Sequence, residues 1–138
     1  MDVLTGVPAQ TAPDRPRNYK IAKQIGLLIL VMAIATFIDW RVHESNPRFY
    51  VEWEYYRNKV IFGALWGFAG FWVFKRWVKN LDFLALVVST VIAVSLQTKY
   101  FFEGRPLDFV FIFMGLHFLM FLAPAFVIFR LFPRVFRD

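Results

Sequence analysis

The chain has 138 residues, of which 59% are hydrophobic and only 19% charged, and it contains 18 phenylalanines and no cysteine. The charges occur in clusters between long apolar stretches, a distribution typical of a membrane-spanning chain rather than of a water-soluble domain. The lack of cysteine excludes disulfides and thiolate chemistry. The net charge of +6 fits Lys and Arg gathered beside apolar segments, and no basic aromatic motif indicates nucleic-acid binding.

Residues 1–19 form a polar segment with several prolines. This composition predicts a cytoplasmic tail that has no regular structure alone. Such a tail becomes ordered where it lies against another surface, so we expect it to bind a partner. Residues 20–138 are expected to form one transmembrane unit.

Four apolar segments follow, at about 21–38, 60–77, 82–97 and 107–131, the third with an alternative end at Phe102. Each supplies roughly the 17–25 residues that a tilted transmembrane helix needs, and none alternates like a membrane barrel strand. The sequence therefore predicts an all-α integral membrane protein, folded as a bundle of four transmembrane helices.

Local signals mark where these helices begin and end. Asn46 before Pro47, and Asn80 before the third segment, are typical helix N-caps. Gly104 is a natural stop before the fourth helix, and Pro133 ends that helix. Asp39, Asp82 and Asp108 lie at segment ends, where we expect them to be solvated or to cap a helix.

Basic residues set the expected orientation. Ten Lys and Arg lie in the terminal segments and the 75–79 connection, against six on the other side, where acidic residues cancel them. This excess predicts that both termini are cytoplasmic, in a bacterial inner membrane or its equivalent.

The connection at 39–58 is rich in aromatic residues interleaved with Arg and Glu. Two interpretations stay open: a belt at the lipid headgroup level, or a docking surface for a partner subunit. The rings in question are Trp40, Phe49, Tyr50, Trp53, Tyr55 and Tyr56.

Small residues form matching rows on two helices. Gly63, Gly67 and Gly70 share one face of the second helix, and the third helix carries small residues four apart. Because lipid gives helices no hydrophobic reason to associate, such rows favour close helix packing. A groove for a flat cofactor is the alternative. The row on the third helix comprises Ala85, Ser89 and Ala93, and Gln97 continues it one turn later.

His117 lies near the middle of the fourth segment, about 15 Å from its start. Intramembrane ionisable residues are candidate functional sites. His117 is therefore a candidate ligand of a metal or haem, a proton relay or a quinone contact, with Met32 at a comparable depth as a conceivable second haem ligand. His43 is expected in the outer connection, too far away to share a haem. The structural alternative is a hydrogen bond from His117 to Ser89, to Thr90 or to a backbone carbonyl.

No catalytic or metal-ligand motif stands out, so we expect no enzyme. The pattern favours an accessory or structural subunit of a larger membrane complex, for example a respiratory or photosynthetic one. Its expected partners are other membrane subunits and bilayer lipids. The alternatives are a membrane anchor that contacts haem, a chlorophyll-type pigment or quinone through His117, and a small oligomeric transporter or channel component.

Overall fold

The computed structural model describes residues 15–137, and for Arg15, Pro16 and Phe49 it describes the backbone alone. These residues form helices and no strand. The expected partner-bound tail falls largely on residues 1–14, outside this range. The elements in chain order are α1 (Arg15–Glu44), the 3-10 helix η1 (Pro47–Phe49), α2 (Trp53–Phe74), α3 (Leu81–Phe102), α4 (Leu107–Leu131) and the short α5 (Pro133–Phe136).

Three of the helices are long and apolar enough to cross a membrane, which indicates a membrane protein. They are α1 from Arg17 to Glu44, α3 and α4. The helix α2 has 22 residues, like α3, but its first turns carry Glu54, Arg57 and Lys59. Those charges lower its mean hydropathy, so it is not one of the three.

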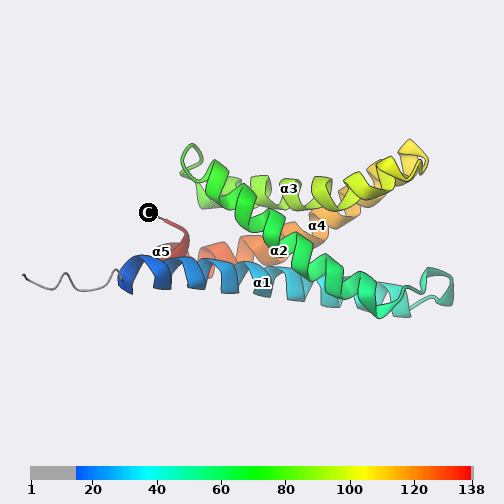
Figure 1. Ribbon diagram of the computed structural model, residues 1–138, viewed down its shortest axis with the longest axis horizontal. Coiled ribbons are helices and arrows are strands. Elements are labelled where there is room, and N and C mark those ends of the chain that lie inside the picture. Colours follow the sequence, from blue (N-terminus) through cyan, green and yellow to red (C-terminus); the bar gives the residue numbers. More distant parts are fainter. Residues whose placement is uncertain (1–14, 138) are drawn as a thin grey trace, which may run out of the picture.

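The helices run back and forth along the long axis of the molecule. The start of α1, the α2–α3 connection and α5 lie at one end, here called the terminal end (Figure 1). The α1–α2 and α3–α4 connections lie at the other end, well apart from each other, and we call it the splayed end (Figure 1). Around the bundle, α1 packs on α2, α2 on α3, α3 on α4, and α4 on α1.

The helix limits agree with the local capping signals. The Asn46 side chain accepts from the Arg48 N–H at 3.0 Å. Asn80 accepts from the N–H groups of Asp82 and Phe83 at 2.8 and 3.1 Å. Gly104 has a φ of +73°, which favours glycine, and it follows the end of α3.

The connection between α1 and α2 is shorter than the range 39–58 predicted for it. The helix α1 continues through Asp39 to Glu44, and α2 begins at Trp53. Most of residues 39–58 is therefore helical. Polar residues continue both helices beyond the apolar segments, because hydropathy marks where a chain is apolar rather than where its backbone leaves the helix.

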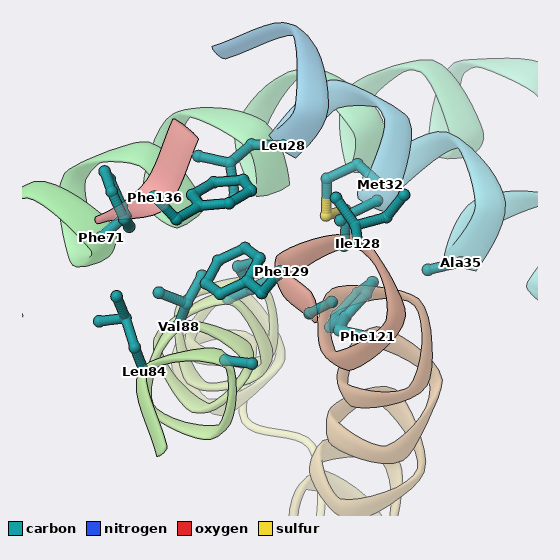
Figure 2. Close-up of a cluster of buried hydrophobic side chains, with 14 of the residues drawn as sticks. Leu28, Met32, Ala35, Phe71, Leu84, Val88, Phe121, Ile128, Phe129 and Phe136 are labelled. Atoms are coloured by element: carbon teal, nitrogen blue, oxygen red, sulfur yellow. The ribbon is translucent and has the colours of Figure 1, made fainter. Parts of the chain in front are cut away.

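The core is apolar and lies where α1, α3 and α4 meet α2 near the terminal end. Leu28 and Met32 from α1, Leu84 and Val88 from α3, and Phe121 and Phe129 from α4 point toward one another (Figure 2). All six are at most 1% exposed. The opposite faces carry exposed Leu, Ile, Val and Phe side chains, as expected for helices that face lipid.

The glycines of α2 permit close approach to both of its neighbours. A Cβ at Gly63 would overlap Met32 Cε of α1, and one at Gly67 would lie 3.0 Å from Ile92 Cδ1 of α3. A Cβ at Gly70 would meet three atoms of Val91 at 3.1–3.3 Å. Ala85, Ser89 and Ala93 are all buried on α3. Both small rows thus lie inside the bundle.

The short helix α5 folds back onto the terminal end. Phe136 is 2% exposed, and its ring stacks on Phe129 with centroids 4.0 Å apart and meets Phe71 edge-on at 5.4 Å. Gln24 of α1 donates to the carbonyl of Val135 at 2.8 Å. The helix α5 is thus part of the packed structure.

Candidate functional site

A buried ion pair joins α1 to α2 near the splayed end. Lys59 Nζ donates to Asp39 Oδ2 at 2.6 Å, and both residues are 4% exposed. The expectation that Asp39 is solvated or caps a helix is therefore wrong. Because α1 extends past Asp39 by more than a turn, this carboxylate lies between packed helices, and a buried carboxylate requires a partner of opposite charge.

The ion pair extends through Tyr55 to His117. Lys59 and Tyr55 are four residues apart, so they share a face of α2, and Lys59 Nζ also donates to the Tyr55 hydroxyl at 3.2 Å. The Tyr55 oxygen lies 3.4 Å from His117 Nε2. His43, at the end of α1, approaches the other oxygen of Asp39, with Nε2 to Oδ1 at 3.7 Å. Both histidines thus belong to one network.

The contacts of His117 determine its tautomer. Its Nδ1 lies 2.7 Å from the Phe113 carbonyl, which can only accept, so Nδ1 carries the proton. Nε2 is then an acceptor that faces the Tyr55 hydroxyl. The Gln97 side-chain amide lies 3.1 Å from the same Nδ1. Since a protonated Nδ1 cannot accept, the amide oxygen, which has no other partner among the described residues, is the group that belongs there.

Of the hydrogen bonds predicted for His117, the one to a backbone carbonyl is formed, on Phe113, whereas those to Ser89 and Thr90 are not. Thr90 donates to the Leu86 carbonyl of its own helix at 2.9 Å, and the Ser89 hydroxyl has no hydrogen-bond partner within residues 15–137. The helix α3 continues to Phe102, so Gln97 lies inside it, and its long side chain reaches His117. Met32, the conceivable second haem ligand, packs in the apolar core against Gly63.

A cleft of about 570 Å³ opens onto this network between α2 and the end of α3. Tyr55, Lys59, Gln97 and His117 contribute its polar lining. Its apolar lining includes Phe62, Trp66 and Leu96, and Glu52, Glu54 and Lys99 also line it. The site therefore combines hydrogen-bond donors with an apolar wall, at the end of the molecule where the two helical hairpins separate (Figure 1).

The predicted docking rings do not all face outward. Tyr50 and Trp53 are 79% and 71% exposed. Tyr56 is buried, with its ring edge-on to those of Tyr55 and His43. Trp40 is half-buried, and the side chain of Phe49 lies outside the described part of the structure. Tyr55 and Tyr56 point inward because α2 begins at Trp53, which places these two residues on the side of the helix that faces α1.

Sequence reasoning identified His117 but not its network. Asp39 and Lys59 were not assigned to the site, and Gln97 was assigned to helix packing only; all three lie at the ends of apolar segments. One signal was available in the sequence. Asp39 and Lys59 carry opposite charges, and they directly flank the first two apolar segments. Among residues 15–137, no three His, Asp or Glu side chains are grouped so that they could hold a metal ion.

Comparison of the chain with protein-family models, with curated proteins and with solved structures finds no match.

Proposed function

We propose that this chain is a four-span membrane protein that binds the polar head of an amphipathic, quinone-like ligand in the cleft beside His117, without catalysis. The observation that carries the proposal is the buried network of Asp39, Lys59, Tyr55 and His117, which opens into a cleft with apolar walls. Ionisable groups are costly between membrane helices and accompany function there.

The chemistry of the lining suits a carbonyl head group. Lys59 has three N–H donors and the described contacts use two of them, on Asp39 and Tyr55. With its oxygen on His117, the Gln97 amide has an NH₂ group without an acceptor among the described residues. Both groups donate, as a quinone carbonyl requires. The volume of about 570 Å³ is in the ordinary range for small-molecule sites, and Phe62 and Trp66 offer surface to a ring or tail.

Haem or pigment ligation by His117 is less well supported. The atom that would bind the metal is Nε2, because Nδ1 donates to the Phe113 carbonyl. Nε2 already has the Tyr55 hydroxyl at 3.4 Å. A macrocycle on His117 would therefore have to displace Tyr55, and with it one hydrogen bond of Lys59.

The binding proposal can be tested by quenching of tryptophan fluorescence. The purified protein in detergent is titrated with a benzoquinone that carries one prenyl unit, and Trp66 is expected to report binding because it lines the cleft. The Gln97→Leu variant should bind about fivefold more weakly, since one hydrogen bond contributes about 1 kcal/mol. Thr98→Val is the matched control, because Thr98 is exposed and donates to the Val94 carbonyl of its own helix. Equal affinity of the Gln97→Leu and control variants would contradict the proposal, as would unchanged quenching in Trp66→Phe.

A second candidate function, accessory subunit of a larger membrane complex, is favoured by exposed aromatic surface at the splayed end. Trp53 and Tyr50 are exposed there, and Trp53 also lines an apolar hollow of about 520 Å³ with Phe37, Trp40 and Ile61. Large exposed aromatic residues are typical anchors at interfaces. Extraction of native membranes in mild detergent tests this: fixed partner chains that are lost with Trp53→Ala would support it, and a monomer would exclude it.

A further inference from the structure

The apolar hollow of about 520 Å³ between α1 and α2 is a separate site from the cleft beside His117. One face of each helix lines it, with residues three or four positions apart. On α2 this face is opposite the one that carries Tyr55 and Lys59, because the two sets of residues differ by about half a helical turn. The lining includes Ala33, Phe37 and Trp40 of α1, with Trp53, Arg57 and Ile61 of α2.

The wall of this hollow is almost wholly apolar, and no acidic residue lines it. It begins beside Trp40 near the splayed end and reaches Ala33, seven residues earlier, which corresponds to about 10 Å along α1. The small side chain of Ala33 leaves this inner part open. A polar group placed inside would lose water without gaining a hydrogen bond, so the part of a ligand that enters the hollow has to be apolar.

Arg57 is the one charged residue of the lining. Its side chain is exposed and forms no hydrogen bond or ion pair within residues 15–137. It lies one turn from Trp53, at the end of the hollow that Trp40 also flanks, and tryptophans in such positions commonly lie at the level of the lipid headgroups. The hollow therefore has a cation in the headgroup region and an apolar wall that extends away from it along the helices.

We propose that this hollow binds an anionic phospholipid, with one acyl chain between α1 and α2 and the phosphate outside the hollow on Arg57. A guanidinium can donate two hydrogen bonds to one phosphate group. Since no carboxylate lines the hollow, the ammonium group of a zwitterionic headgroup would have no partner there, and its charge would weaken the attraction of the phosphate to Arg57. The proposal does not depend on ligand binding beside His117.

Native mass spectrometry of the full chain in detergent tests this site. Phosphatidylglycerol is compared with phosphatidylcholine that has the same acyl chains, and we expect phosphatidylglycerol to bind more tightly. Arg57→Gln should weaken the binding of phosphatidylglycerol about fivefold, the usual effect of one cation near an anionic lipid. Ala33→Leu fills the inner part of the hollow and should weaken the binding of both lipids. Arg57 and Ala33 are both exposed, so neither change removes a buried contact.

Two matched controls keep the hollow unchanged. Arg105→Gln removes an exposed cation at the same end of the molecule, and Ala123→Leu enlarges an exposed alanine of α4; neither residue lines the hollow. Both variants should bind phosphatidylglycerol as the parent chain does. An Arg57→Gln loss no greater than that of Arg105→Gln would overturn the phosphate contact, and Ala33→Leu with the affinity of Ala123→Leu would overturn the hollow as the acyl-chain site.

Two further results would overturn the proposal in other ways. Equal affinity of the parent chain for the two lipids would exclude recognition of the anionic headgroup. A partner chain that is extracted with the protein from native membranes, and that Ala33→Leu releases, would show that the hollow is a protein interface and not a lipid site.

Discussion

At the scale of single residues, the pair of Asp39 and Lys59 is the most consequential feature of the chain. Each residue is 4% exposed, and their 2.6 Å contact is the shortest in the network. Moving two charges out of water is costly, and the cost is offset here by their mutual attraction and by the hydroxyl of Tyr55. The ion pair also holds Lys59 in position as a donor in the cleft, so the geometry of the proposed ligand site depends on this pair.

Removing one charge of this pair should therefore destabilise the protein more than removing both charges. Lys59→Met leaves Asp39 buried and unpaired, and we expect a loss of about 3–5 kcal/mol in stability. The double variant Asp39→Leu/Lys59→Met leaves no orphan charge and should recover most of this loss. Thermal unfolding followed by tryptophan fluorescence measures both, and a Lys59→Met variant with the Tm of the parent chain would contradict the buried ion pair.

Asp39 and Lys59 also show what sequence could not predict at this scale. A charge next to an apolar run looks the same whether its helix stops there or continues for another turn. The helix ends could be predicted from the sequence, because Asn46, Asn80 and Gly104 act on their immediate neighbours in the chain. The ion pair was not, because it depends on how α1 and α2 cross, and no local pattern encodes that crossing.

At the scale of elements, α2 approaches α1 and α3 closely at Gly63, Gly67 and Gly70. The atoms that each glycine faces differ in how easily they can move. Met32 presents the end of a flexible side chain to Gly63, whereas Val91 presents a branched Cβ and both methyl groups to Gly70. The nominally closer contact is therefore the more adaptable one.

Alanine substitution should reveal this difference between the two glycines. Gly70→Ala is expected to destabilise the protein by about 1–3 kcal/mol, the usual cost of overpacking, since Val91 cannot turn away. Gly63→Ala should cost less, because the Met32 methyl can swing aside. Gly26→Ala is the control, as no atom lies within 4 Å of its added Cβ. Denaturation in detergent gives the order, and a larger loss for Gly63→Ala would refute the argument.

The docking of α5 is a further element-scale feature with a measurable effect. Phe136 is buried against Phe129 and Phe71. Phe136→Ala should cost about 3 kcal/mol or more, the usual range for a buried ring. Val127→Ala, on the exposed face of α4, serves as the control and should change the Tm little. An equal small effect of both variants would show that α5 is not packed in the membrane-bound protein.

At the scale of the whole molecule, the arrangement bears on how many helices cross the bilayer. The helices α1, α3 and α4 are apolar enough to cross, and α2 connects the splayed end to the terminal end alongside them (Figure 1). If α1 and α3 both cross, α2 has to cross between them. Hydropathy alone could not establish this, because it counts Lys59 of α2 as a charge in lipid, whereas this residue is buried and paired with Asp39 of α1.

Four crossings and three crossings predict different topologies. With four, reporters fused at the two ends of the chain lie on the same side of the membrane. We expect that side to be the cytoplasm, since the terminal end carries the excess of Lys and Arg. Protease accessibility in sealed vesicles of known orientation distinguishes the cases, and reporters on opposite sides would exclude the four-span bundle.

The bond from Gln24 to Val135 has a consequence for biosynthesis. The first helix enters the membrane while the ribosome has yet to make α5, so during translation the amide of Gln24 lacks the carbonyl that satisfies it, and Phe71 lacks the ring of Phe136. A polar group and an aromatic face of the early helices therefore remain uncovered until α5, more than a hundred residues later in the chain, has been made. A nascent chain that stalls before α5 would therefore keep this surface uncovered.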